Sequence, residues 1–355
     1  MGIVIEPYGF ITELELENIR WREAREKPFD LYGLDMANSD TQYRRLPADV
    51  AEATSRSVTN LAKVTTGGRI RFCTDSDVIA LHTEMLTMNH MDLMARTGSA
   101  GFDLYVKEGA RFYYYASFKP GYPKEGKGYE QVVKFPGRKL RQIMIHFPLY
   151  SQVKNVYIGL KEDAALDHGV GYRYDKPVVY YGSSITQGGC VSRPGNTYQA
   201  IISIDYDCDF VNLGFAGAAK GEDAIRDYIA SLDMSVFVLD YDHIAPTKEH
   251  LTDTFEPFYR AVREKHPDMP ILFVTAPDTH QYIHGGTVRD ERRAVIYNVY
   301  RKALAEGDRN IHYIDGDTLF EGEHHDIYTV DGCHPTDAGA ICMADRIGHV
   351  LATLL

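Results

Sequence analysis

The sequence predicts two domains, an N-terminal all-β sandwich and a C-terminal three-layer α/β/α domain. The chain has 355 residues, which is enough for two domains of about 100–200 residues each. Residues 1–170 contain many short strand patterns without alternating helix patterns, whereas strand and helix patterns alternate through residues 171–355. The first arrangement is typical of a sandwich or jelly roll, and the second of a doubly wound parallel sheet.

The composition is that of a soluble globular protein and argues against nucleic-acid and membrane partners. Charged residues make up 25% of the chain and hydrophobic residues 44%. The formal net charge of −12 would repel both nucleic acid and anionic lipid. No run approaches the roughly 18 apolar residues of a membrane span, and the N-terminus lacks the basic start of a secretory signal.

The five cysteines indicate a reducing compartment. Their number is odd, and no C-x-x-C pair occurs, which fits free thiols better than a disulfide framework. We therefore expect a cytoplasmic protein that acts on a small molecule. Whether it forms a homo-oligomer is left open by the sequence. The cysteines are Cys73, Cys190, Cys208, Cys333 and Cys342.

Strands in the first half are expected where apolar and polar residues alternate. In Arg111–Phe118 this pattern places Phe112, Tyr114, Ala116 and Phe118 on one face. The tyrosines at 113–115 have two interpretations, because exposed aromatic rings stack on sugars but tyrosine is also a favoured strand residue. The remaining strand patterns are Ile70–Cys73, Val78–Leu86, Phe102–Val106, Gln142–Phe147 and Val153–Leu160.

The second half repeats a strand and a helix five times, which predicts a parallel sheet with helices on both faces. The third helix is the clearest, because its apolar residues keep i, i+3, i+4 spacing behind Thr247, a helix N-cap residue. The strand patterns are Val178–Tyr181, Phe210–Leu213, Val236–Leu239, Ile271–Thr275 and Ile311–Ile314. The helix patterns are Thr197–Ile204, Asp223–Ser231, Lys248–Lys265, Asp290–Glu306 and Asp337–Leu354.

Polar and glycine-rich loops follow these strands, and ligands of such sheets bind beyond the carboxyl ends of the strands. Ser184 follows the first strand in a tight Gly-Ser-Ser turn and is the candidate nucleophile. His334 is the candidate base, and Asp331 can hold its other ring nitrogen. Backbone N–H groups of Ser184 and Gly217 can face a tetrahedral oxyanion, since Gly217 has no Cβ. Together these groups predict acyl transfer to water.

The same residues resemble those of the SGNH (GDSL-type) hydrolases. G-S-S-I-T-Q-G (182–188) is similar to the nucleophile block of that family, Gly217 matches its second block, and D-G-C-H (331–334) matches its terminal D-x-x-H. Ser183 stands where many members have Asp. G-F-D-L-Y (101–105) resembles the GxDLY signature of a β domain that precedes some SGNH domains. The resemblance implies a flavodoxin-like α/β/α hydrolase domain over residues 171–355, a jelly-roll-like β domain over 1–170, and a serine esterase without a cofactor.

The third block departs from the family pattern. That block is G-x-N-D, and its asparagine donates to the oxyanion, whereas this chain has D-Y-D-H at 240–243. An ionised Asp242 would oppose a developing negative charge. Three interpretations are open: Asp242 turns away to hold the loop, it is protonated, or the oxyanion hole has only two backbone donors. We favour the first.

Other sites are weaker alternatives. Arg193 and His280 lie in loops beside the candidate site and are candidate substrate contacts. A metal site is the other interpretation of the histidines and aspartates near the C-terminus, but no H-x-x-x-H or H-E-x-x-H spacing occurs, so we expect no metal. No G-x-G-x-x-G or G-K-[ST] loop supports nucleotide binding. The residues of the metal alternative are His324, His325, Asp326, Asp331 and His334.

The sequence therefore predicts a serine esterase that hydrolyses a small, short-acyl ester, and similar two-domain proteins suggest a carbohydrate-linked one. The alternative is a carbohydrate-binding protein whose hydrolase domain has lost activity, motivated by the altered third block. Whether the first domain completes the pocket is left open by the sequence.

Overall fold

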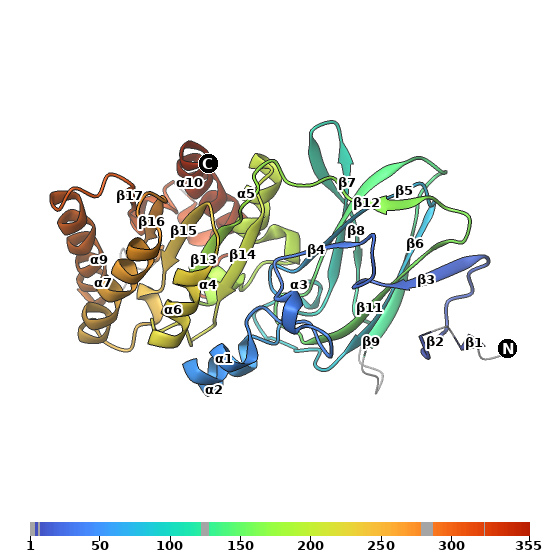
Figure 1. Ribbon diagram of the computed structural model, residues 1–355, viewed down its shortest axis with the longest axis horizontal. Helices are drawn as coiled ribbons and strands as arrows, with labels where there is room; N and C mark the ends of the chain where they lie inside the picture. The colour runs from blue at the N-terminus through green and yellow to red at the C-terminus, as the bar shows by residue number, and fades with distance from the viewer. Residues whose placement is uncertain (1–3, 6–7, 122–127, 278–286, 323) are drawn as a thin grey trace. The chain divides into compact units, whose positions relative to one another are not determined.

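A computed structural model describes residues 4–5, 8–121, 128–277, 287–322 and 324–355 (Figure 1). The chain forms two compact units. The β unit comprises Met1–Arg45, Lys63–Gly171 and Ser192–Gly195, and the α/β unit comprises Leu46–Ala62, Tyr172–Val191 and Asn196–Leu355. A single division near residue 170 would place residues 46–62 in the β unit and residues 192–195 in the α/β unit. Instead, residues 46–62 belong to the α/β unit and residues 192–195 to the β unit.

The β unit is a sandwich of two antiparallel sheets that share one core. Ile70 and Phe72 of one sheet and Ile79 and Leu81 of the other are all fully buried in the same cluster. The expected fold class is confirmed here. In spatial order, the six-stranded sheet contains β12 (Leu166–His168), β5 (Arg69–Thr74), β10 (Arg141–His146), β7 (Phe102–Glu108) and β8 (Arg111–Phe118), with β4 (Asp30–Tyr32) also paired to β5. The four-stranded sheet contains β3 (Ile19–Glu23), β11 (Val153–Lys161), β6 (Val78–Met85) and β9 (Gly128–Lys134), while β1 (Val4–Ile5) pairs with β2 (Ile11–Thr12).

A β-bulge in β8 overturns the expectation that its even-numbered residues share one face. Leu104 pairs with Ala116 and Tyr105 pairs with Tyr114, so Tyr115 is the extra residue. The side-chain alternation reverses at such a bulge. Ala116 therefore packs against the sandwich core with Phe118, whereas Phe112 and Tyr114 lie on the other face of the sheet.

The α/β unit contains a five-stranded parallel sheet between two layers of helices, as expected. The strand order is β14 (Phe210–Gly214), β13 (Val178–Gly182), β15 (Val236–Asp240), β16 (Ile271–Val274) and β17 (Ile311–Ile314). This 2-1-3-4-5 order is that of flavodoxin-like folds. The helices are α1 (Ala48–Thr54), α2 (Arg56–Leu61), α4 (Ser184–Gln187), α5 (Tyr198–Tyr206), α6 (Asp223–Ser231), α7 (Lys248–Lys265), α9 (Thr287–Ala305) and α10 (Asp337–Leu354).

Apolar clusters cover both faces of the sheet, and every residue of β13, β15 and β16 is buried. Helices α6, α7 and α9 cover one face, and α5 and α10 cover the other (Figure 1). Phe237 of β15 points to the first layer and Val238 to the second, which is the alternation of a strand covered on both sides. The shorter helical segments of the chain are α3 (Arg96–Ser99), η1 (Met36–Asn38), η2 (Pro194–Asn196), η3 (Asp242–Ile244), η4 (Gly316–Thr318) and η5 (His325–Ile327).

Helices α1 and α2 were not predicted, because residues 1–165 were expected to be β structure. They lie in the α/β unit, where Ala51 and Val58 join the same buried cluster as Ile225 of α6. Ser55 separates the two helices, and its side chain accepts the Val58 N–H as the N-cap of α2. Each helix has seven residues or fewer, too few for a helical period to stand out in the sequence.

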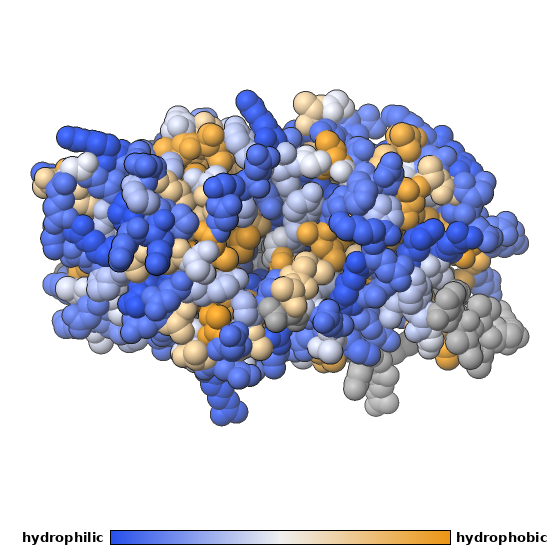
Figure 2. All heavy atoms as spheres, viewed as in Figure 1, coloured by the Kyte–Doolittle hydropathy of each residue, from blue (hydrophilic) through white to orange (hydrophobic). Residues whose placement is uncertain are grey.

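Hydrophilic residues cover most of the face seen in Figure 2, with hydrophobic residues scattered between them. This surface agrees with the formal net charge of −12. Among the described residues, no helix is long and apolar enough to cross a membrane.

Candidate active site

The turn after β13 presents Ser184 at the start of a helix. Ser183 is the N-cap of α4, and its side chain accepts the Ile185 N–H at 3.2 Å. Gly182 has no room for a side chain, because a Cβ there would lie 2.1 Å from the Asp240 carbonyl oxygen. Helix α4 is four residues long and ends at Gly188, whose φ of +98° favours glycine. The serine is 8% exposed, so the surrounding residues cover most of its surface.

Ser184, His334 and Asp331 form a continuous hydrogen-bonded chain. Ser184 Oγ lies 2.8 Å from His334 Nε2, and His334 Nδ1 lies 2.7 Å from Asp331 Oδ2. Because a carboxylate accepts from the Nδ1–H, the Nε2 lone pair faces the serine hydroxyl. The geometry is that of a nucleophile, a base and an orienting carboxylate.

The D-G-C-H loop forms one turn around the Asp331 carboxylate. Asp331 Oδ1 accepts the backbone N–H of Cys333 at 3.0 Å and that of His334 at 2.8 Å. Partial burial opposes ionisation of Asp331, but the hydrogen bonds from the His334 backbone and ring and from Cys333 outweigh it, so the pKa of Asp331 is lowered. The carboxylate therefore stays charged where it can stabilise a protonated His334 ring.

Buried amide side chains that the sequence analysis missed hold the nucleophile turn. Asn212 Nδ2 and Gln199 Nε2 both donate to the Thr186 carbonyl, at 2.7 and 2.8 Å. Gln187 Oε1 accepts the Ala216 N–H at 2.8 Å, which ties the turn to the loop that contains Gly217. The only sequence signal was a polar Asn inside the buried strand pattern of β14.

Gly217 has a backbone conformation that favours glycine. Its φ is +65°, and no atom lies within 4 Å of where a Cβ would be. The positive φ, and not crowding, therefore explains the glycine. Its part in an oxyanion hole stays a prediction.

Asp240 and Asp242 are both buried in the third loop, at 3% and 4% exposure. Asp242 accepts the Ala276 N–H on both carboxylate oxygens, at 3.1 and 3.2 Å, as expected of a residue that holds two loops together. Burial raises the pKa of Asp242 to about 6, although the N–H groups of Ala276 and His243 oppose this effect. Burial and the neighbouring Asp242 raise the pKa of Asp240 to about 8, so Asp240 is mostly protonated at neutral pH.

His243 and Cys333 form a second contact beside the candidate triad. The Cys333 Sγ lies 2.9 Å from His243 Nε2. Burial lowers the pKa of His243 to about 4 and raises that of Cys333 to about 11, so at neutral pH a thiol faces a neutral imidazole. The two residues come from loops 90 positions apart in the sequence, and the sequence analysis did not join them.

The remaining expected site residues are distributed as follows. Arg193 lies in the β unit, where it donates to Tyr105 Oη at 2.7 Å and lies 3.5 Å from the buried Asp103. Its substrate role stays a prediction. His280 lies outside the described residues. His324 and Asp326 are exposed and His325 is partly exposed, all in or beside η5. Among the described residues, the ligand atoms that lie within 4.8 Å of one another are instead those of Asp331, Cys333 and His334.

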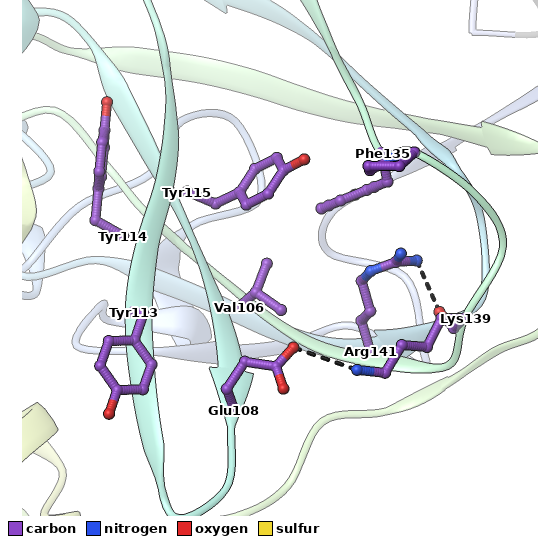
Figure 3. A pocket seen from close by; sticks show the side chains of 9 residues that line it. Val106, Glu108, Tyr113, Tyr114, Tyr115, Phe135, Lys139 and Arg141 are labelled. Atoms are coloured by element: carbon purple, nitrogen blue, oxygen red, sulfur yellow. Dashed lines mark hydrogen bonds and ion pairs between the residues drawn. The ribbon is translucent and has the colours of Figure 1, made fainter.

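The β unit has a separate cavity of about 260 Å³ at the end of β8 (Figure 3). Tyr113 and Tyr115 line it and are 53% and 42% exposed. The Tyr115 ring packs 4.6 Å from that of Phe135, and the Arg141 guanidinium lies 4.3 Å from the Phe135 centroid. Aromatic rings beside fixed polar groups are typical of a small-molecule site.

Two families of known proteins match consecutive parts of this chain. Residues 175–352 match the family described as GDSL-like Lipase/Acylhydrolase. Residues 19–166 match the GxDLY family, which is described as the N-terminus of SGNH-hydrolase-type esterases. A search among curated proteins found no match.

Several solved structures are similar over nearly the whole chain. A protein described as a GDSL-like lipase from Bacteroides ovatus is 26% identical, with a TM-score of 0.86 over 95% of this chain and 98% of that chain. A salicylyl-acyltransferase from a tetracycline biosynthetic pathway is 20% identical, with a TM-score of 0.76 over 96% and 99%. A family two carbohydrate esterase from Cellvibrio japonicus is 12% identical, with a TM-score of 0.62 over 95% and 98%. The last two comparisons show a shared fold.

Proposed function

Because the chain belongs to the GDSL-like lipase/acylhydrolase family and is an ester hydrolase, we propose that Ser184, His334 and Asp331 are its catalytic triad. We further propose that its substrate is a small, short-acyl ester, and a carbohydrate-linked one in particular.

The hydrogen-bonded chain from Ser184 to Asp331 is the observation that supports this function best. At 2.8 Å from Ser184 Oγ, His334 Nε2 can take the hydroxyl proton as the serine attacks an ester carbonyl. The protonated ring then donates that proton to the leaving alcohol. Water repeats the sequence on the acyl-enzyme, which releases the acid and restores the serine.

The oxyanion of each tetrahedral intermediate needs hydrogen-bond donors. We assign the backbone N–H groups of Ser184 and Gly217 to this role. Asp242 is bound to the Ala276 N–H, which favours a loop-holding role for it and an oxyanion hole with two backbone donors.

The near-complete burial of Ser184 supports a small acyl group. The carbohydrate part of the proposal has two supports. Family two carbohydrate esterases share the fold over almost the whole chain, and the β unit exposes tyrosine rings beside a cavity. The same tyrosines support the second candidate function, a carbohydrate-binding protein with an inactive hydrolase unit.

The test of the triad is the intact mass of the protein after exposure to a fluorophosphonate. We expect one adduct on wild type, mapped to the peptide that carries Ser184, and none on Ser184→Ala. Ser231→Ala, which changes an exposed serine on α6, is the matched control and should label like wild type. An adduct that persists on Ser184→Ala would refute the assignment.

The substrate class is tested by hydrolysis of acetylated sugars beside simple acetyl esters and longer acyl esters. We expect kcat/KM to fall with acyl length and to be highest for acetylated sugars. A protein that shows no adduct and no hydrolysis but is retarded by soluble polysaccharide in an affinity gel would support the second candidate. Loss of that retardation in Tyr115→Ala would then place sugar binding at the cavity of Figure 3.

A further inference from the structure

The thiol of Cys333 lies among side chains that are ligands of soft and borderline metal ions. His243 Nε2 lies 2.9 Å from the Cys333 Sγ. In addition, one ligand atom each of Asp331, Cys333 and His334 lie within 4.8 Å of one another. Zn–S and Zn–N bonds of about 2.3 and 2.0 Å in a tetrahedron place neighbouring ligand atoms about 3.5 Å apart. The side chains of Asp331, Cys333 and His334 are therefore close enough to converge on one ion after small rotations. His243 lies outside this set and can join them through its contact with Cys333.

We propose that Cys333, His243 and the His334–Asp331 pair form an inhibitory binding site for a Zn²⁺ ion. Cys333 and His243 supply two ligands, and the His334–Asp331 pair supplies the third. This site is distinct in function from the hydrolysis itself, and it rests on the proposed triad only for its inhibitory effect.

The chemistry of these groups suits zinc more than calcium or magnesium. A thiolate and an imidazole are zinc ligands, whereas calcium and magnesium take oxygen ligands. The Nε2 atom of His243 lies 2.9 Å from the Cys333 Sγ, so the two ligand atoms already face one another. The Cys333 thiol must release its proton to solvent as the Zn–S bond forms, which makes binding tighter as pH rises.

The charges around the site support a dication. The Cys333 thiolate and the Asp331 carboxylate together neutralise Zn²⁺. Two nearby cations, Arg289 and Arg292, oppose binding of the ion. Hydrogen bonds to the carbonyl oxygens of His243 at 2.9 Å and Ala245 at 2.6 Å hold the Arg292 guanidinium in place. The Cys333, His334 and His243 side chains are all partly exposed, so an ion can enter from solvent.

Bound zinc would stop the proposed reaction for a simple reason. The lone pair of His334 that would bind the ion through Nε2 is the one that accepts the Ser184 proton. If Asp331 binds instead, the carboxylate that orients the His334 ring is diverted. Either ligand removes the base from the serine, so zinc and catalysis exclude each other.

Direct metal binding is the first test, and it does not depend on activity. Co²⁺ added to the intact protein should give a thiolate-to-cobalt charge-transfer band and an intense tetrahedral visible spectrum, and Zn²⁺ should displace it with a stoichiometry of one. Cys333→Ser should abolish the charge-transfer band. Cys342→Ser, which alters another partly buried thiol of the same unit, should keep it.

The second test is inhibition. Zn²⁺ should suppress ester hydrolysis and fluorophosphonate labelling, and a chelator should restore both. Cys333→Ser and His243→Asn should raise the half-inhibitory Zn²⁺ concentration at least tenfold, while Cys342→Ser leaves it unchanged. Ser184→Ala should still bind Co²⁺, because the serine is not a ligand.

Equal zinc sensitivity of Cys333→Ser and wild type, or a cobalt spectrum without a thiolate band, would overturn the inference. If the variants do not fold, wild type alone decides, since Zn²⁺ should protect Cys333 from iodoacetamide while Cys342 continues to react. A protein that binds Co²⁺ through Cys333 but never labels at Ser184 would refute the proposed triad and leave the metal site standing.

Discussion

Asp331 accepts three hydrogen bonds, two from backbone N–H groups and one from the His334 ring. In Asp331→Asn the amide can keep the backbone contacts but can also donate to Nδ1, which places the ring proton on Nε2. That tautomer cannot accept the serine proton. We expect kcat to fall about 10⁴-fold with little change in KM, measured by steady-state hydrolysis of an acetyl ester. A fall of less than tenfold in a folded variant would argue that Asp331 does not set the tautomer.

The raised pKa of Asp240 predicts that the stability of the folded protein depends on pH. Its pKa is raised to about 8 by burial and by Asp242, whereas an aspartate in the unfolded chain has a pKa of about 3.9. The folded state therefore binds this proton more tightly. The stabilisation is complete below about pH 4 and is lost as pH rises through about 8.

The substitution Asp240→Asn should remove this dependence, because an amide cannot ionise but can still accept the Thr186 hydroxyl, which lies 3.1 Å from Asp240 Oδ2. We expect the Tm of wild type to fall more steeply from about pH 5 to 8.5 than that of the variant. Asp175→Asn, an exposed change, should follow wild type. Parallel Tm curves for wild type and Asp240→Asn would contradict the assignment.

Some of the residues that lie together in the candidate site could be predicted from the sequence. Ser184, Asp331 and His334 were expected together and do lie together, because each follows a strand or precedes a helix at one edge of a parallel sheet. Their catalytic role stays a prediction. The contact between Cys333 and His243 was not accessible, since nothing in the chain fixes how two loops of different strands meet.

At the scale of elements, periodicity was a good guide where it extended over several turns. The helices at 223–231, 248–265 and 337–354 have the expected bounds. The bulge at Tyr115 was not predictable, because one extra residue leaves the strand pattern intact and only the pairing with β7 reveals it. Helices α1 and α2 were missed because their apolar residues are explained by packing on α6, and not by a pattern within either helix.

The cap between these two helices gives an element-scale prediction. The Ser55 side chain accepts the Val58 N–H at 3.2 Å, and without it this donor has no capping acceptor in the first turn of α2. We expect Ser55→Ala to lower the free energy of unfolding of the α/β unit by about 1 kcal/mol, measured by urea denaturation. Ser57→Ala, an exposed change two residues later in α2, is the matched control and should have little effect. Equal losses in both variants would mean that the cap does not stabilise the helix.

At the scale of the whole molecule, the fold class followed from the switch between strand-only and alternating patterns, and it is confirmed. The sequence did not reveal that each unit is built from separate segments of the chain. Residues 46–62 precede most of the β unit in the chain yet pack in the α/β unit, and only long-range burial of their apolar side chains decides this. No local pattern in the sequence indicates that residues 46–62 pack in the α/β unit.

Because the α/β unit includes residues 46–62, we can predict the stability of a fragment that lacks them. A fragment of residues 172–355 contains the whole parallel sheet but lacks Leu46 and Val58, which are 0% and 1% exposed in its helical layer. Fully burying such side chains contributes about 1.5–3 kcal/mol each. We therefore expect the fragment to bind a hydrophobic dye and to unfold at a lower urea concentration than a fusion that carries residues 46–62 on a long Gly/Ser linker.

The fusion tests packing and not mere chain length, because a linker without these residues adds no apolar surface. The same fusion with Val58→Asp should behave like the bare fragment, since a charge cannot enter the cluster without a partner. If the bare fragment is as stable as the fusion, residues 172–355 fold as a complete unit, and helices α1 and α2 do not stabilise it. If only the fusion with Val58 is stable, the α/β unit is built from sequence on both sides of the β unit, and a cut at residue 170 removes part of its core.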